Sequence, residues 1–305
     1  MDHRAGIPRT QRSSRRADWI AEAEPDGDGH LQPGLTLFLT NRECPWRCLM
    51  CDLWRHTLTE RVSPGDVPFQ IETALSEAGA ARSSARWIKL YNAGSFFDAG
   101  AIPSVDHPAI AAQLTGFDRV VVENHPALTD RRVLPFRDAL GLVKLEIAMG
   151  LETAHPTVLE QLNKGIDLTG FRRAADFLRD RQIALRVFVL IRPPFLSEPE
   201  ALHWACRSID FAFDCGAAVV SLIPTRLGNG ALEALAAQGQ FSPPQLETAE
   251  AVFRYGLKQR RGRVLLDLWD LEKSVSDPAS IPEQRALLEE ANQKQCFSGG
   301  RETGL

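Results

Sequence analysis

The sequence predicts an α/β fold in which strands and helices alternate along a partial (β/α)6 barrel. Three observations support this prediction. Short apolar segments rich in β-forming residues end in Gly, Asn or Pro, a helical pattern follows each of them, and the unit repeats six times before the C-terminal part. Such alternation implies βαβ units with right-handed crossovers and a parallel sheet. From the pattern alone, a full eight-fold barrel and an open doubly wound sheet stay open as alternatives.

The individual elements follow from their spacing. Helix 169–181 shows the reasoning, because Phe171, Ala174 and Leu178 recur at helical spacing and Thr169 is the expected N-cap. The predicted strands are 35–40, 86–91, 119–123, 143–149, 183–190, 217–223 and 263–269. The predicted helices lie near 68–80, 106–115, 156–163, 169–181, 198–214, 230–238 and 243–260.

The chain divides into three predicted parts. Residues 1–30 are expected to be a disordered arm, because five arginines between positions 4 and 16 precede an acidic, Gly-rich stretch without apolar periodicity. This arm is either a solvated tail or a basic segment that touches a polyanion. Residues 31–240 are predicted to form the barrel, and 241–305 a short C-terminal α/β extension that packs on it.

Composition limits the function classes. A chain of 305 residues with 44% apolar and 24% charged residues suits one large globular domain or two small ones. The net charge of −4 gives no overall basic field that would indicate a nucleic-acid partner. There is no apolar run of about 20 residues and no apolar signal core at the N-terminus. We therefore expect a cytoplasmic protein without a membrane partner.

Three of the six cysteines lie within eight residues, where Cys44, Cys48 and Cys51 have the spacing C-x3-C-x2-C. They follow strand 35–40, so their thiolates can converge on one metal centre at the end of a strand. Three ligands are one short of a closed structural zinc site, and an open position suits chemistry. Iron–sulfur clusters are also held by thiolates. The scattered Cys206, Cys215 and Cys296 are predicted to be ordinary thiols in a reducing compartment.

The C-x3-C-x2-C loop after a first strand resembles that of the radical S-adenosylmethionine (radical SAM) enzymes. The resemblance implies a radical SAM barrel and one 4Fe-4S cluster held by Cys44, Cys48 and Cys51, with SAM bound to the fourth iron. In that family an aromatic residue usually precedes the third cysteine and lies near the adenine. Here the position is Met50, a departure from the pattern, although its polarizable side chain can also pack on a ring.

The resemblance also implies residues that bind SAM. The segment with Asn92, Gly94 and Ser95 follows the second strand, and Gly lets the backbone approach a ligand closely. Glu152 matches a strand-end residue that binds the ribose in many members. Lys164 resembles the basic residue that pairs with the SAM carboxylate. Its alternative interpretation is a helix C-terminal Lys before a Gly cap.

Four further polar residues are candidates in the barrel. Arg186 lies inside an apolar strand, which is costly unless the charge is paired, so we expect it to meet an anionic group and assign it to cofactor binding. Glu123 would face the barrel mouth, and His125 could exchange a proton near neutral pH. Glu123, His125 and Arg192 are the predicted substrate-binding residues. No catalytic residue is assigned.

Looser phrases favour one branch of the family. Residues 150–153 and 162–165 resemble the branch of the Elongator catalytic subunit and the tRNA methylthiotransferases. Residues 91–98, 123–126 and 188–195 are similar to the radical SAM subunits of archaeosine synthase, which act on a modified deazaguanine in tRNA. The resemblance implies a lyase or transferase acting on a nucleobase in tRNA, with a partner subunit and a flavodoxin- or ferredoxin-type electron donor.

Two alternatives stay open. A small-molecule substrate suits the lack of basic bias in the chain. A non-catalytic scaffold that binds zinc or an iron–sulfur cluster is the alternative of another class, and in its zinc form Cys44, Cys48, Cys51 and His56 would be the ligands.

Overall fold

The computed structural model describes residues 7–271 and 281–297. Its strands form one eight-stranded sheet in the order β1 to β8, so neighbours along the chain are neighbours in the sheet. Strands β2 to β8 are parallel, and β1 is antiparallel to β2. The strands are β1 (Asp18–Pro25), β2 (Leu31–Leu39), β3 (Trp87–Asn92), β4 (Arg119–Glu123), β5 (Lys144–Glu152), β6 (Ala184–Ile191), β7 (Val219–Pro224) and β8 (Arg263–Leu266).

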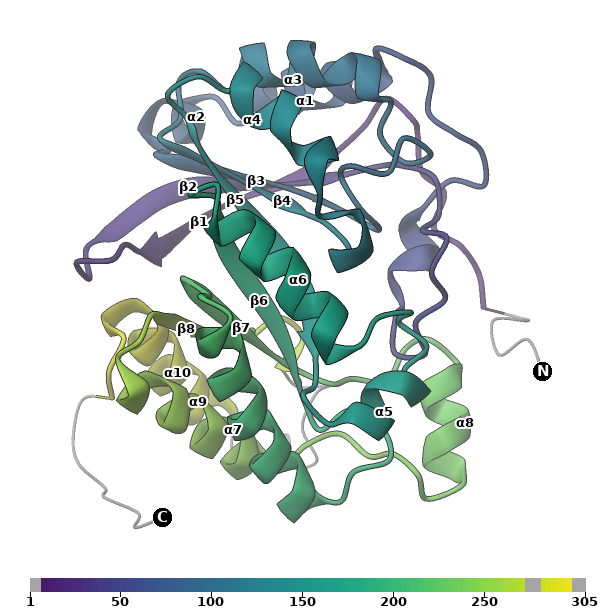
Figure 1. The fold of residues 1–305 in the computed structure, drawn as a ribbon, viewed down its shortest axis with the longest axis vertical. Coiled ribbons are helices and arrows are strands. Elements are labelled where there is room, and N and C mark those ends of the chain that lie inside the picture. Colours follow the sequence, from purple (N-terminus) through teal and green to yellow (C-terminus); the bar gives the residue numbers. More distant parts are fainter. Residues whose placement is uncertain (1–6, 272–280, 298–305) are drawn as a thin grey trace.

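The sheet curls into a partial barrel, as predicted (Figure 1). Sequential strand order excludes the doubly wound alternative, in which the order reverses at a switch point. Eight parallel strands in a closed ring are also excluded, because β1 runs antiparallel to β2 and no pairing joins β1 to β8 in the described part of the chain. The six repeats that begin with β2 to β7 form the barrel, and β8 extends the same sheet beyond residue 241.

Helices cover the outer surface of the sheet in two groups. Figure 1 shows α1, α3 and α4 together on one side and α7, α9 and α10 on the other, while α5 and α8 lie toward the strands' carboxyl ends. Apolar side chains of the strands pack against these helices in one large core. The helices are α1 (Asp66–Glu77), α2 (Ala80–Ser84), α3 (His107–Gln113), α4 (Leu134–Ala139), α5 (Pro156–Gln161), α6 (Leu168–Arg179), α7 (Glu198–Asp214), α8 (Ala231–Ala237), α9 (Leu246–Gln259) and α10 (Ile281–Lys294).

All seven predicted strands and all seven predicted helices are present. The last strand ends at Leu266 rather than at residue 269, and α2, α4 and α10 were not predicted. Helices α2 and α4 have only five and six residues, which is too short for a clear period. The N-cap of α6 is Asp167 and not Thr169, because the Asp167 carboxylate accepts a hydrogen bond from the Gly170 amide at 2.6 Å.

The prediction of a disordered arm over residues 1–30 is wrong from residue 18 onward; residues 1–6 lie outside the described residues. Strand β1 pairs with β2 along its whole length, from Asp18 opposite Phe38 to Pro25 opposite Leu31. Its Glu24 is buried and bonded to Lys89, 2.6 Å away on β3. The acidic composition suggested solvation, but cations from other strands neutralise these charges.

Helix α10 covers the free edge of β8 with two amide side chains. Asn292 accepts from the Leu266 amide at 2.8 Å and donates to its carbonyl at 2.9 Å. Gln295 does the same for Val264, with both distances 2.9 Å. The two amides thus occupy the positions of a ninth strand, and they satisfy backbone groups that would otherwise form an open edge.

Within the described ranges, no helix has both the length and the apolar character required to span a membrane.

Candidate active site

The cysteine loop, residues 44–51, leaves the carboxyl end of β2. Cys44, Cys48 and Cys51 are half-buried free thiols. Among the described residues, the three sulfur atoms do not all lie within 4.8 Å of one another. Nor do any two of them together with a His56 ring nitrogen.

Burial controls the ionisation of these thiols. It raises the pKa of Cys44 to about 11 and that of Cys51 to about 12. Thiols in this state need nearby positive charge before they become ligands, and metal ions supply it. The donor set therefore fits a cationic metal centre, such as an iron–sulfur cluster.

Main-chain contacts hold the cysteine loop against two neighbouring segments. Leu49 donates its amide hydrogen to the Leu162 carbonyl at 2.9 Å, and the Asn163 side chain donates to the Arg47 carbonyl at 3.0 Å. The buried Asn229, after β7, donates to the Leu49 carbonyl at 2.7 Å. We call residues 162–165 the Lys164 turn. The loop is thus fixed by segments that follow β5 and β7.

Trp46 lies between the first two cysteines and is stacked on His125. The ring centroids are 3.8 Å apart and the planes differ by 12°. On the Lys164 turn, a Cβ added to Gly165 would lie 3.1 Å from the Trp46 ring, so glycine permits the close approach. His125 also bonds the Lys164 carbonyl through Nε2 at 2.9 Å. One histidine therefore contacts both the cysteine loop and the Lys164 turn.

Glu152 and Lys164 form an ion pair at the carboxyl end of β5. The Lys164 Nζ lies 2.7 Å from a Glu152 carboxylate oxygen, and both side chains are buried. Burial alone would lower the pKa of Lys164, but Glu152 and Cys48 outweigh it and raise the pKa. The pair lies over Gly150, where an added Cβ would collide with the Glu152 carboxylate. The two predicted SAM-binding residues are therefore brought together beside the cysteines.

The segment after β3 forms a polar cradle around Gly94. An added Cβ there would lie 3.5 Å from both the Asn92 amide nitrogen and the Cys44 Cβ. Both amide atoms of the buried Asn92 side chain, and Oδ1 of Asn41, have no hydrogen-bond partner in the described structure. Orphaned buried amides next to Cys44 call for a polar ligand. The amino and carboxylate groups of SAM fit that requirement.

Two other predicted cofactor residues have different surroundings. Met50 packs against a second apolar cluster, which α5 and the end of β6 supply with Val158, Leu162, Leu190 and Leu196. This apolar surrounding suits a flat ring. Ser95 is buried, and its hydroxyl accepts from the His125 amide at 3.0 Å. Its side chain therefore supports His125.

Glu123, the last residue of β4, accepts a hydrogen bond from the main-chain N–H of Asn92 at 3.1 Å. Burial raises its pKa to about 8. Lys164 acts to lower the pKa of this carboxyl, so Glu123 lies within electrostatic reach of the ion pair. Glu123 thus belongs to the same end of the barrel as the cysteines.

The expectation that His125 exchanges a proton near neutral pH is not supported. Burial and then Lys164 lower its pKa to about 4. Its Nδ1 accepts from the Ala127 amide at 3.1 Å, so Nε2 carries the hydrogen that it donates to the Lys164 carbonyl. The ring is a fixed neutral donor.

Arg186 lies apart from the other predicted cofactor residues. It is the third residue of β6, whereas the cysteines, Glu152 and Lys164 are beyond or at the strands' carboxyl ends. Its guanidinium bonds both oxygens of Glu24, at 2.9 and 2.7 Å, and Glu146 at 2.7 Å. The anionic groups that it meets are protein carboxylates, so cofactor binding by Arg186 is not supported.

Arg192, a predicted substrate residue, is also engaged within the protein. Its guanidinium bonds the Glu198 carboxylate and donates to the Pro243 carbonyl at 2.9 Å. These bonds tie the segment after β6 to the first residue of α7 and to the loop before α9. A substrate would have to compete with them.

The basic arm is docked along the barrel. Arg9 bonds Glu43 and the Trp54 carbonyl, Arg12 bonds Asp18, and Arg15 lies 3.8 Å from Asp66. Arg4 lies outside the described residues. These contacts engage Arg9, Arg12 and Arg15 within the chain, whereas Arg16 is exposed.

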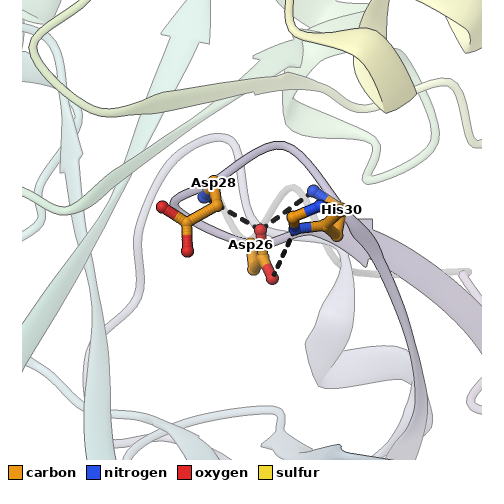
Figure 2. A group of neighbouring side chains, drawn as sticks. All are labelled: Asp26, Asp28 and His30. Atoms are coloured by element: carbon orange, nitrogen blue, oxygen red, sulfur yellow. Dashed lines mark hydrogen bonds and ion pairs between the residues drawn. The ribbon is translucent and has the colours of Figure 1, made fainter.

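A group of possible cation ligands outside the barrel mouth is Asp26, Asp28 and His30 in the β1–β2 turn (Figure 2). Asp28 and His30 are exposed. The Asp26 carboxylate already accepts from both of their amides, each at 2.9 Å. These bonds shape the turn, and nothing further points to an ion.

Sequence comparison identifies related proteins. Archaeosine synthase subunit beta of Methanosarcina acetivorans is 30% identical over 230 residues, 72% of this chain and 66% of that protein. The protein of the same name from Thermococcus kodakarensis is 27% identical over 54% of the chain and 52% of its own length. The chain thus spans roughly half to two thirds of these relatives. No model of a known protein family matches it.

Solved structures share the fold. Methylornithine synthase (PylB) matches 75% of this chain and 63% of its own, with a TM-score of 0.54 and 13% identity. Elp3 of Methanocaldococcus infernus matches 66% of this chain and 52% of its own, with a TM-score of 0.52 and 15% identity. The shared barrel, the cysteine loop after its first parallel strand and the relatives decide the family.

The chain belongs to the radical SAM superfamily. Several residues that hold the site of this radical SAM protein together were not predicted as site residues, chiefly Trp46, Asn163 and Asn229. Trp46 lies inside the cysteine motif, and Asn163 precedes Lys164, so closeness to predicted site residues was a usable signal for both. Asn229 is 178 residues from Cys51, so its contact with the cysteine loop depends on the tertiary structure.

Proposed function

We propose that this chain is a radical SAM enzyme in which Cys44, Cys48 and Cys51 hold a 4Fe-4S cluster and SAM binds the remaining iron. One observation carries the proposal. The three cysteines, the Glu152–Lys164 pair and the orphaned amide of Asn92 gather at one end of the barrel. When bound, the cluster would supply one electron to SAM, giving methionine and a 5′-deoxyadenosyl radical that takes a hydrogen atom from the substrate.

The chain's own residues bind and orient the cofactor. Lys164 offers its ammonium group to the SAM carboxylate, and Glu152 offers its carboxylate to the ribose hydroxyls. Asn92 and the cradle at Gly94 receive the amino group. Met50 packs on the adenine beside the apolar cluster of Val158, Leu162, Leu190 and Leu196. Together these side chains replace water around a reactive group.

A modified nucleobase in tRNA is the proposed substrate. The relatives named archaeosine synthase subunit beta support this choice, because 72% of the chain is similar to one of them. Their name also supports a partner subunit. Glu123 is the proposed substrate contact, because it lies at the barrel mouth beside the cofactor residues. The group transferred or eliminated depends on that substrate, so the class is lyase or transferase.

A small-molecule substrate is the second candidate, and two observations favour it. The net charge is −4, and the described arginines 9, 12 and 15 of the N-terminal arm are bonded within the chain. If tRNA is the substrate, a partner subunit has to supply much of the phosphate contact.

We also propose a cytoplasmic location and a flavodoxin- or ferredoxin-type electron donor. Six free cysteines suit a reducing compartment, and a 4Fe-4S cluster needs a one-electron source at low potential.

Anaerobic reconstitution tests the proposal. We expect about four irons per chain, a cluster spectrum that changes on SAM addition, and 5′-deoxyadenosine as a product with a chemical reductant. One tightly held zinc ion per chain without any response to SAM would instead support the non-catalytic scaffold. Binding of candidate tRNAs, with and without a partner subunit, then separates the two substrate classes.

A further inference from the structure

His125 contacts two segments that are far apart in sequence. Its ring is stacked on Trp46, 79 positions earlier, at a centroid distance of 3.8 Å. Its Nε2 bonds the main-chain carbonyl of Lys164 at 2.9 Å. Trp46 belongs to the cysteine loop, and Lys164 carries the ammonium group that pairs with Glu152. One side chain thus connects the thiols with the ion pair.

His125 itself is held in place from several directions. Its amide donates to the Ser95 hydroxyl at 3.0 Å, and Nδ1 accepts from the Ala127 amide at 3.1 Å. The side chain is 7% exposed. With both nitrogens bonded, the ring has one tautomer and one orientation, which are requirements for a rigid support.

Trp46 is half-buried, and this arrangement contacts its ring twice. His125 covers one side of its ring, and Gly165 of the Lys164 turn approaches it closely enough that an added Cβ would lie 3.1 Å away. The turn makes two further bonds to the loop, from Leu49 to the Leu162 carbonyl and from Asn163 to the Arg47 carbonyl. Histidine, tryptophan and turn therefore form one packed unit.

We propose that His125 is a positioning residue, which holds the cysteine loop against the Lys164 turn and so sets the separation between the three thiols and the Glu152–Lys164 pair. This inference rests on the proposed function of that site. His125 touches neither the cysteines nor the ion pair's charged atoms in any bond that the structure shows, so it acts through Trp46 and the Lys164 carbonyl.

The first experiment uses cluster-free protein, so it does not depend on metal. Alkylation rates of individual cysteines are measured by mass spectrometry in Trp46→Ala, His125→Ala and the double variant. We expect Cys44 and Cys48 to react roughly tenfold faster in each variant, which is the scale expected when one aromatic pair is removed. The double variant should react no faster than the faster single variant, because both changes break the same ring stacking.

Two controls separate loop release from unfolding. Cys215 is 1% exposed and lies in the main core, so its alkylation reports global opening and should stay unchanged. His203→Ala removes another His–Trp ring contact, with Trp204 at 5.4 Å, from an exposed position on α7. We expect this variant to leave Cys44 and Cys48 at wild-type rates.

The second experiment separates the two contacts of His125 in reconstituted protein. His125→Phe keeps a ring for Trp46 but loses the donor to Lys164, and His125→Gln keeps a donor but loses the ring. We expect the Phe variant to retain iron against a chelator like wild type, while its cluster spectrum responds to SAM at several-fold higher SAM concentration. The Gln variant should lose iron faster.

Wild-type rates of alkylation and iron loss in both His125→Ala and Trp46→Ala would overturn the proposal. So would additive effects in the double variant. If wild-type protein takes up no iron, the proposed function fails, but the alkylation rates still decide whether His125 positions the loop.

Discussion

The ammonium of Lys164 lies 2.7 Å from the carboxylate of Glu152, and the pair is buried next to the cysteine loop. Glu152 adopts this position with a φ of 66°, a left-handed conformation that is uncommon for residues other than glycine. Such strain persists where the surroundings impose it and is typical of ligand-binding sites. The pair therefore has the character of a prepared binding group.

Replacing Gly150 with Ala should displace this ion pair, because the new Cβ would collide with the Glu152 carboxylate and lie 2.7 Å from Lys164 Nζ. We expect SAM affinity to fall at least about tenfold, equivalent to about 1.4 kcal/mol, with iron content unchanged. Titration of the cluster spectrum with SAM measures the effect. Gly116→Ala is the matched control, because an added Cβ there meets nothing within 4 Å. Unchanged SAM affinity in the Gly150 variant would contradict a binding role for the pair.

Replacing Cys44, Cys48 or Cys51 with Ala should abolish SAM cleavage, because each removes one of three iron ligands. The same change at Cys206, Cys215 or Cys296 should leave cleavage intact. Iron content and 5′-deoxyadenosine formation measure the outcome. A Cys206 variant that lost the cluster while a Cys48 variant kept it would show that the ligands are assigned incorrectly.

Glu123 should make folding stability depend on pH. Burial raises its pKa from 4.5 to about 8, so between these values the folded chain holds a proton that the unfolded chain has released. Its contribution to stability is therefore full below about pH 4.5 and decreases as pH rises to 8, by at most about 1.4 kcal/mol per pH unit. Urea unfolding of cluster-free wild type and Glu123→Gln between pH 5 and 8 measures it. Relative to the Gln variant, wild type should lose stability with rising pH, and parallel curves would argue against the shift.

Replacing Arg186 with Met should destabilise the fold by about 3–5 kcal/mol, because Glu24 and Glu146 would stay buried with fewer cations around them. Burial acts to raise the pKa of Glu24, yet Arg186 and Lys89 hold it well below the usual range. Chemical unfolding of cluster-free protein gives the number. Arg86→Met is the control, because it breaks the ion pair of Arg86 with Asp118, in which both side chains are more than half exposed. This variant should change stability by less than about 1 kcal/mol. A small effect at Arg186 with weakened SAM binding would restore its predicted cofactor role.

Replacing Arg9, Arg12 and Arg15 together with Ala should lower thermal stability, because the three side chains bond Glu43, Asp18 and Asp66. The salt dependence of tRNA binding should stay the same. If these arginines bound phosphates instead, the log–log slope would flatten by roughly 0.7–0.9 for each phosphate that is no longer neutralised. Affinities at several salt concentrations, with any partner subunit present, distinguish the two.

Much of this protein could be predicted from local sequence. Each parallel strand is a short apolar run, and the helix that follows repeats its apolar residues at helical spacing, because burying those faces dominates the energy of the barrel. The cysteine spacing and the polar residues at strand ends could also be predicted, because both are features of the local sequence. Parallel strands place their carboxyl ends together, so Asn92, Glu123 and Glu152 were expected at one rim, and each ends its strand.

Tertiary structure decided which charges are free for function. Arg186 and Glu24 are 162 positions apart, and only the antiparallel addition of β1 brings them together. Local composition predicted that Glu24 is solvated and that Arg186 binds an anionic ligand. In the structure both charges are buried, and each is tolerated because the other neutralises it. The sequence suggested that His125 exchanges a proton. In the folded chain, burial lowers its pKa, and its two ring nitrogens are bonded to the Ala127 amide and the Lys164 carbonyl. Apolar periodicity indicates which faces of a local segment are buried. The partner of a buried charge depends instead on packing between segments that are distant in sequence.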